Sequence, residues 1–148
     1  ILLGLVGSEM CIRDRLCTGN SCRSQMAHGY LVKLLHKEAS IYSAGIEKHG
    51  LNPYAVSVMK MDGVDISGNS SNLVDEYMSI EFDYIITVCD HANETCPYIP
   101  SKNAVRTHKN FLDPSATKID DEDEKIVKYI KCRDEIKYFC IGFKQKNF

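Results

Sequence analysis

The sequence predicts an α/β fold, with one domain built on a parallel sheet that carries helices on both faces. Strand-like and helix-like segments alternate along the chain, which is typical of parallel strands connected by helices. The length of 148 residues is that of one domain. Apolar residues make up 44% and charged residues 26% of the chain, which is ordinary globular usage and excludes a mainly disordered protein.

Each expected element has its own signal. Residues 24–38 carry apolar side chains at three- and four-residue spacing, as on one face of a helix. Asn52 and Pro53 are typical of a helix start, and this second helix should end near Gly63. Residues 82–89 are rich in β-branched and aromatic side chains and predict a buried strand. The remaining expected elements are a strand at 41–44, a short helix at 73–78, a weaker strand at 103–108 and a last helix at 120–139 with an acidic, dipole-complementing start.

The composition excludes several function classes. A net charge of −2 gives no electrostatic footprint for nucleic acid or for a lipid surface. No apolar run approaches the roughly 20 residues of a membrane-spanning helix. The seven cysteines are unevenly spaced and contain no CxxC pair, which argues against a disulfide scaffold and against a zinc module. We expect a reducing, cytoplasmic location in which some thiols serve chemistry.

The first residues require separate treatment. Residues 5–15, LVGSEMCIRDR, resemble the in-frame translation of a transposase adapter used to prepare sequencing libraries. We interpret residues 1–15 as a non-native N-terminal extension, an adapter-like scar, and residues 16–148 as the domain; Cys11 then has no evolved function. A natural polar tail is the alternative, whereas a signal peptide is a poor interpretation because the apolar stretch is short and lacks a basic flank.

The segment CTGNSCRS, residues 17–24, lies between an expected strand end and an expected helix start. Gly19 allows a tight turn, so that successive backbone N–H groups and the helix N-terminus can surround an anion. Arg23 supplies a planar fork for two oxygens of a tetrahedral oxyanion, and the same field favours the thiolate form of Cys17 as a nucleophile. The expected oxyanion-binding residues are Thr18, Gly19, Asn20, Ser21, Cys22, Arg23 and Ser24. A helix-capping loop with a buried cysteine is the alternative.

Two further motifs carry chemistry. Cys89 closes the buried strand and Cys96 follows a polar loop, so the two thiols can form a disulfide and pass oxidation outward. One alternative is that Cys89 is a buried cysteine and Cys96 an incidental loop cysteine. Another is a metal site with His91 or His108, but these histidines lack the spacing of paired ligands. Asp113-Pro114 predicts a rigid turn in which Asp113 can donate a proton to a leaving oxygen if the fold brings it over the first loop; an ordinary turn is the alternative. Outside these motifs, Cys132 and Cys140 are expected to be small core or edge residues.

Together, these motifs resemble those of the thioredoxin-coupled arsenate reductases, within the low-molecular-weight tyrosine phosphatase superfamily. The resemblance covers about residues 16–140. It rests on CTGNSCRS, YSAG at 42–45, HGLNP at 49–53, DIS at 65–67, TVCDHANETCP at 87–97 and Asp113-Pro114. It implies a four-stranded parallel sheet with helices on both faces. Phosphate-monoester hydrolysis is the alternative function. The phosphatases as a rule lack the Cys89/Cys96 pair, so the presence of this pair favours arsenate reduction.

The resemblance also implies a mechanism. Cys17 attacks arsenate held by the loop that ends at Arg23, and Asp113 protonates the departing hydroxyl. Cys89 then releases arsenite by forming a disulfide with Cys17, and Cys96 moves that disulfide to a loop where thioredoxin reduces it. We expect arsenate and thioredoxin as partners, a monomer, no tightly bound cofactor, no metal, and neither nucleic acid nor membrane.

Three departures from the family pattern have consequences. The strand before Cys17 should be apolar, but CIRDRL stands there, and buried charges cost several kcal/mol each unless they are paired. Asn20 and Ser43 match a monovalent-cation site of some relatives, whereas His28 and Asn72 stand at usually acidic positions. We therefore expect no potassium activation. Ser115 replaces the tyrosine that is usual in the phosphatases, which weakens the aryl-phosphate interpretation.

Overall fold

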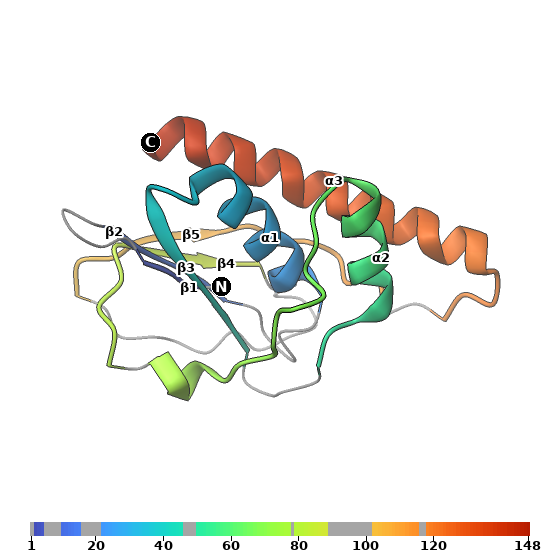
Figure 1. Ribbon diagram of the computed structural model, residues 1–148, viewed down its shortest axis with the longest axis horizontal. Helices are drawn as coiled ribbons and strands as arrows, with labels where there is room; N and C mark the ends of the chain where they lie inside the picture. The colour runs from blue at the N-terminus through green and yellow to red at the C-terminus, as the bar shows by residue number, and fades with distance from the viewer. Residues whose placement is uncertain are drawn as a thin grey trace.

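Strands and helices alternate along the chain, as the sequence predicts (Figure 1). The computed structural model describes residues 2–4, 10–15, 22–45, 50–77, 79–88, 102–115 and 118–148, the first two ranges by their backbone. The elements in chain order are β1 (Leu2–Gly4), β2 (Met10–Arg15), α1 (Arg23–Leu35), β3 (Ala39–Ala44), α2 (Pro53–Met61), the 3-10 helix η1 (Val74–Tyr77), β4 (Tyr84–Thr87), β5 (Val105–His108) and α3 (Glu122–Asn147).

Five strands form one sheet in the order β1-β3-β2-β4-β5. The strand β2 runs parallel to β3 and β4, and β4 runs parallel to β5. The short strand β1 runs antiparallel to its neighbours. The expected count of four strands, all parallel, is therefore not confirmed in that form, because the apolar start of the chain pairs back onto the sheet. Residues 10–15 occupy an interior strand, at the position where the family pattern calls for an apolar one.

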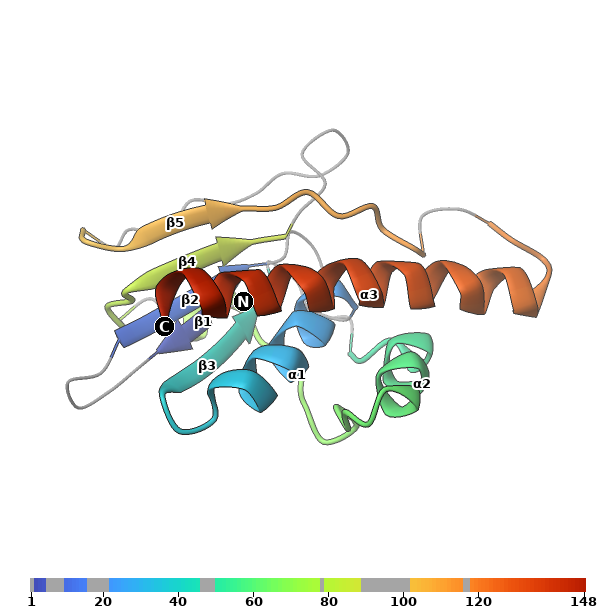
Figure 2. The same ribbon diagram turned by 90° about the horizontal axis from the view of Figure 1, so that it is seen from above.

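Both faces of β4 are covered. Ile86 packs into the main core between the sheet and the helices α1 and α3, whereas its neighbour Ile85 belongs to a smaller cluster with Ala44 and Phe82 on the other face. Figures 1 and 2 show the three α-helices to one side of the sheet and η1 to the other. The expectation of helices on both faces is therefore met by three α-helices on one face and only a short 3-10 helix on the other. This short helix and its flanking residues suffice to cover the smaller cluster.

The helix boundaries follow local chemistry. Asn52 caps α2 as expected, since its side-chain oxygen accepts hydrogen bonds from the backbone N–H groups of Tyr54 (2.9 Å) and Ala55 (3.4 Å). The last helix was expected to end at residue 139, which is wrong, because α3 continues to Asn147. Its extra turns are retained because Phe143 is buried and packs edge-on against Tyr84, with ring centroids 5.5 Å apart. Among the helices that the structure describes, none could cross a membrane.

A polar clip at Asp62 joins all three α-helices. Asp62, the C-cap of α2, accepts hydrogen bonds from the Tyr30 hydroxyl of α1 (2.7 Å) and from the Lys137 ammonium of α3 (2.8 Å). Tyr30 is only 3% exposed, so its hydroxyl would lose its acceptor in the core if Asp62 were removed. The substitution Asp62→Ala should therefore lower the free energy of unfolding by about 1–3 kcal/mol, measured by urea denaturation.

The stabilisation that the hydrogen bonds to Asp62 give to the fold should also depend on pH. Hydrogen bonds from Lys137 and Tyr30 lower the pKa of Asp62 below its ordinary value. A carboxylate with a lowered folded-state pKa stabilises the fold above its unfolded-state pKa, and this stabilisation is lost as the pH falls through the folded-state pKa. The difference between Asp62→Ala and the wild-type chain should thus shrink in acid. Asp65→Ala, at an exposed aspartate nearby, is the control, and an equal loss there would contradict the assignment.

Candidate active site

The N-terminus of α1 meets the loop before α3 at Arg23. Arg23 is the first residue of α1, and its side chain is 4% exposed. One guanidinium nitrogen, Nη1, donates to the carbonyl oxygen of Phe111 at 2.9 Å, and Nη2 lies 3.5 Å from Oδ2 of Asp113. The structure therefore brings together two side chains that are 90 residues apart in the sequence and that the motif analysis assigned to one site.

Asp113 is held in a defined orientation by the turn that follows it. Its Oδ1 accepts hydrogen bonds from the backbone N–H of Ser115 (2.9 Å) and from the Ser115 hydroxyl (2.7 Å). Because Oδ1 is engaged within the turn, Oδ2 is the oxygen directed at Arg23. The Asp113 side chain is 30% exposed and is therefore accessible to a ligand and to solvent.

The beginning of α1 offers a positive helix end. Cys22 is the N-cap residue, and its carbonyl accepts the first helical hydrogen bond, from the N–H of Met26 at 2.9 Å. The first-turn N–H groups and the helix dipole favour an anion at this end. Cys22 is buried, and burial together with nearby Cys132 and Asp113 raises the pKa of its thiol well above the ordinary value. The Cys22 thiol thus stays protonated and is not itself a nucleophile.

Most of the predicted thiol chemistry lies outside the described residues. Of the predicted loop, the structure describes Cys22, Arg23 and Ser24, all of which are buried. The expected positions that lie outside the described residues are Cys17, Thr18, Gly19, Asn20, Ser21, Cys89, His91 and Cys96. Their assigned roles stay predictions.

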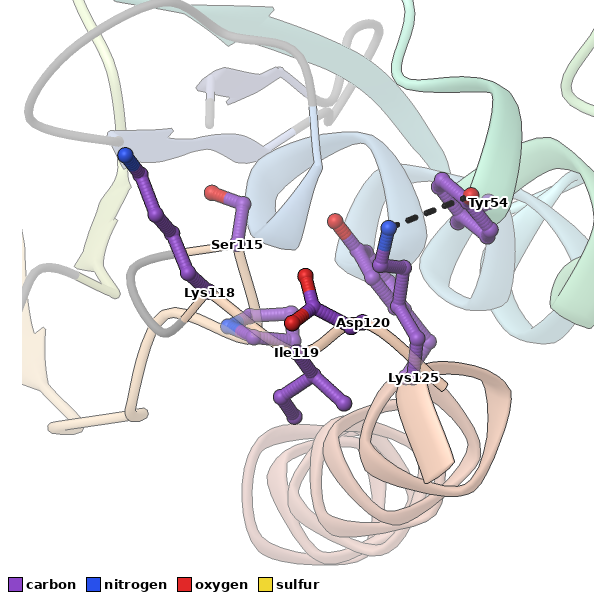
Figure 3. Close-up of a pocket in the computed structure, with 8 residues that line it drawn as sticks. Tyr54, Ser115, Lys118, Ile119, Asp120 and Lys125 are labelled. Atoms are coloured by element: carbon purple, nitrogen blue, oxygen red, sulfur yellow. Dashed lines mark hydrogen bonds between the residues drawn. The ribbon is translucent and has the colours of Figure 1, made fainter. Parts of the chain in front are cut away.

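A pocket of about 380 Å³ opens beside the Asp113 turn, between α2 and the start of α3. In Figure 3 the side chains of Ser115, Asp120 and Lys125 rise toward the same side of this pocket. Its wall contains Tyr54, which stacks on Tyr129 with ring centroids 5.1 Å apart. The residues that line the pocket are Tyr54, Pro114, Ser115, Lys118, Ile119, Asp120, Lys125 and Tyr129. Sequence analysis missed these aromatic residues because they belong to no motif and come from separate helices.

The sequence predicts only part of the environment of Cys132. It is buried, as expected of a small core residue, but its thiol also donates to the carbonyl oxygen of Leu112 at 3.8 Å. Cys132 therefore contacts the residue that directly precedes Asp113 in the chain. No spacing in the sequence relates position 132 to position 113, so this neighbourhood was visible only in the structure.

His28, Ser43 and Asn72, which the sequence analysis compared with a monovalent-cation site, line one pocket of about 260 Å³. Burial lowers the pKa of His28 to about 4, so its imidazole is neutral. The residues that line this pocket in the described ranges include no carboxylate to balance a cation. Nor does the described part of the chain contain a group of three or more ligating side chains suited to a metal ion. These residues fit a monovalent cation poorly, and the absence of potassium activation stays a prediction.

Comparisons with known proteins show the family to which the chain belongs. The family described as low molecular weight phosphotyrosine protein phosphatase matches residues 15–146. An arsenate reductase of Halalkalibacterium halodurans is 49% identical over 121 residues, which are 82% of this chain and 86% of that protein. An arsenate reductase of Bacillus subtilis is 46% identical over the same shares of the two chains. A solved arsenate reductase in the phosphate binding state superimposes with a TM-score of 0.70 at 24% identity, covering 90% of this chain and 95% of that one.

Proposed function

Because the chain belongs to the low molecular weight phosphotyrosine protein phosphatase family, we propose that it is an enzyme that reduces arsenate to arsenite. The observation that carries this proposal is the Arg23–Asp113 pair at the N-terminus of α1, in a chain 46–49% identical to two arsenate reductases. The pair supplies the two functions that oxyanion chemistry needs, a buried planar cation and a partly exposed carboxyl group.

The first half of the proposed reaction forms a bond to arsenic. Arg23 and the N-terminus of α1 hold the arsenate oxygens, and the Cys17 thiolate attacks arsenic. Asp113 gives a proton through Oδ2 to the departing oxygen, which leaves as water. The Ser115 hydrogen bonds to Oδ1 keep the carboxyl group in place during this step.

The second half moves two electrons. Cys89 attacks the Cys17 sulfur, so the Cys17–arsenic bond breaks, arsenic leaves as trivalent arsenite, and a Cys17–Cys89 disulfide forms. Cys96 then attacks the Cys89 sulfur, which frees Cys17 and leaves a Cys89–Cys96 disulfide. A thioredoxin dithiol reduces that disulfide and becomes oxidised in turn. One arsenate and two thiols thus give one arsenite, one disulfide and water, which balances the two-electron reduction.

The alternative function is hydrolysis of phosphate monoesters with Cys17, Arg23 and Asp113. Two observations disfavour it. The Cys89/Cys96 pair takes no part in the hydrolytic step, in which its use would be to protect Cys17 from overoxidation, and the position after Asp113-Pro114 is Ser115 in place of an aromatic residue. The pocket beside the turn does contain aromatic rings, but these come from α2 and α3.

The test is a coupled assay. Arsenate-dependent NADPH oxidation is measured with thioredoxin and thioredoxin reductase, in parallel with hydrolysis of p-nitrophenyl phosphate. We expect NADPH oxidation that needs both arsenate and thioredoxin. Hydrolysis of the ester without arsenate-dependent NADPH oxidation would establish the phosphatase function instead. Glutaredoxin in place of thioredoxin is the control for the identity of the reductant.

Several finer features belong to the same proposal. Thioredoxin as the electron donor and a cytoplasmic location are supported by the reducing chemistry of the thiols. A monomeric state is part of the same proposal. The net charge of −2 supports the proposal that neither nucleic acid nor a membrane is a partner. We further propose that the family core is the parallel set β3, β2, β4 and β5, to which β1 is an addition.

We also propose that residues 1–15 are a non-native extension. The family match begins at residue 15, which supports this boundary. Residues 10–15 nevertheless form the interior strand β2, so the charged sequence CIRDR takes the place of an apolar strand. The triple variant Arg13→Val/Asp14→Ile/Arg15→Val should raise the free energy of unfolding by about 3 kcal/mol or more, since a desolvated charge costs several kcal/mol.

Thermal denaturation measures this gain, at about 2–4 °C per kcal/mol for a chain of this size. The matched control is Arg106→Val/Lys109→Val, which removes two charges at the exposed edge of the sheet. An unchanged melting temperature in the triple variant would show that the charges of β2 are accommodated, and would remove this support for the extension. The restored variant also serves as the second protein in the coupled assay if the chain itself unfolds.

A further inference from the structure

The two oxygens of the Asp113 carboxyl group have different surroundings. Oδ1 accepts hydrogen bonds from the backbone N–H of Ser115 at 2.9 Å and from the Ser115 hydroxyl at 2.7 Å. Oδ2 lies 3.5 Å from Nη2 of Arg23, which is longer than an ordinary hydrogen bond. The turn therefore engages one carboxyl oxygen, and the other faces the buried guanidinium that we assign to the oxyanion site.

This difference determines which oxygen carries the proton when the carboxyl group is neutral. Oδ1 already accepts two hydrogen bonds, which engage both of its lone pairs, so a proton there would have to displace one donor. Among the described residues, Oδ2 has no donor within ordinary hydrogen-bond distance. The neutral carboxyl group therefore carries its proton on Oδ2, from where the proton can pass to an oxygen atom that Arg23 holds.

We propose that the Ser115 hydroxyl is a positioning group for arsenate reduction, because it keeps the Asp113 proton on Oδ2. The inference rests on the proposed function, in which Asp113 protonates the departing oxygen. In that step the Oδ2–H bond breaks, a new O–H bond forms on the departing oxygen, and this oxygen leaves as water. Ser115 keeps its own proton and acts only through Asp113.

The hydrogen bond from Ser115 also changes in strength during this step. A hydrogen bond to an ionised acceptor is roughly twice as strong as one between neutral groups. The Ser115 hydroxyl therefore binds the carboxylate that remains after proton transfer more strongly than the carboxyl group before it. An interaction that strengthens on the way to the transition state raises the rate and leaves substrate binding nearly unchanged. Loss of the hydroxyl should thus lower the rate and spare the affinity.

The chain contains a matched control for this turn. Ser67 donates to Oδ1 of Asp65 from its backbone N–H at 2.9 Å and from its hydroxyl at 2.6 Å. Both serines are exposed. The turn is thus a local structure that forms at two places in the chain, and it does not by itself indicate a catalytic role. The turn at Asp113 differs because its second carboxyl oxygen lies beside the buried Arg23 guanidinium.

The first experiment compares Ser115→Ala, Ser115→Thr and Ser67→Ala in the rate of arsenite release from a single turnover at saturating arsenate. Ser115 is exposed and lines the pocket of about 380 Å³ (Figure 3), so neither substitution there should disturb the core. We expect Ser115→Ala to lower the rate about 10-fold or more, as for the loss of a hydrogen bond to a charged group. Ser115→Thr, which keeps the hydroxyl, should retain most of the rate, and Ser67→Ala should leave it unchanged.

Two further readouts separate positioning from a general loss of structure. Affinity for phosphate, a non-reducible oxyanion, should be retained in Ser115→Ala, because Arg23 and the helix end remain. In the Asp113→Asn background, which has no carboxyl proton, Ser115→Ala should cause no further loss of rate. The proposal would be overturned by a retained rate in Ser115→Ala, by the same fold loss in both backgrounds, or by a loss of phosphate affinity as large as the loss of rate.

An infrared measurement tests the placement of the proton without any turnover. The C=O stretch of the protonated Asp113 carboxyl group is the band that Asp113→Asn removes from the spectrum in acid. With the proton on Oδ2, Oδ1 is the carbonyl oxygen, so this band should move to higher frequency in Ser115→Ala, which removes one of the two donors. It should stay in place in Ser67→Ala.

A band that does not move in Ser115→Ala would show that the serine hydroxyl does not bind the carbonyl oxygen, and the proposal would fail. This measurement contains no arsenate, NADPH or thioredoxin. Failure of the positioning role and failure of the proposed reductase activity are therefore distinguishable.

Discussion

Replacing Cys96 with serine should stop steady-state arsenate reduction but leave one round of chemistry per chain. In the proposed relay Cys96 acts after arsenite has left, when it attacks Cys89 and exports the disulfide. A serine hydroxyl cannot take part in thiol–disulfide exchange, so the chain should stop as a Cys17–Cys89 disulfide. We expect the coupled NADPH oxidation rate to fall by at least ~10³-fold, as for removal of an essential nucleophile.

A single-turnover experiment separates this result from a folding defect. With arsenate in excess, Cys96→Ser should release about one arsenite per chain in the first cycle and then no more. Peptide mapping of the spent protein should find Cys17 joined to Cys89. The control is Cys140→Ala, which removes a buried thiol from α3 and should retain full turnover. Steady turnover by Cys96→Ser with thioredoxin would show that the third thiol is dispensable and would leave a two-thiol mechanism.

How far the sequence predicts this fold depends on how local the signal is. The Asn52 cap was predictable because a capping side chain binds its own helix within three residues. The length of α3 was not, because Phe143 is retained in the helix by Tyr84, a partner from the sheet. The smaller hydrophobic cluster on the other face of the sheet could not be predicted either, since it depends on which residues of β4 point to which side.

How much of the candidate site can be predicted from the sequence also depends on how local the signal is. Arg23 and Asp113 could be identified because each sits in a short motif with an evident chemical use, and the structure brings them within 3.5 Å. Tyr129 and Cys132 belong to a helix with no motif, and their relation to Asp113 depends entirely on how α3 packs against α1. Sequence patterns identify residues that act through local backbone geometry, whereas residues that approach the site from a packed helix require the fold itself.

Replacing Arg23 with lysine should lower kcat/KM for arsenate by about 10²–10³-fold, although the positive charge is retained. Lysine is a point donor on a flexible stem and cannot bind two oxygens in one plane. In the present arrangement Arg23 also holds the Phe111 carbonyl and faces Asp113, so the substitution loosens the segment that carries the proton donor. The loss should appear in both kcat and KM, measured in the coupled assay over a range of arsenate concentrations.

The pair can be tested for joint action through Asp113→Asn, which keeps the shape of the side chain and removes its exchangeable proton. Because Arg23 and Asp113 are 3.5 Å apart, the losses in the double variant should be less than the sum of the single losses in free energy. Binding of phosphate, a non-reducible oxyanion, should weaken in Arg23→Lys and change little in Asp113→Asn. If Arg23→Lys kept its phosphate affinity, the guanidinium would only support residues 111–113 and would not be an anion ligand. The oxyanion site would then have to lie elsewhere in the fold.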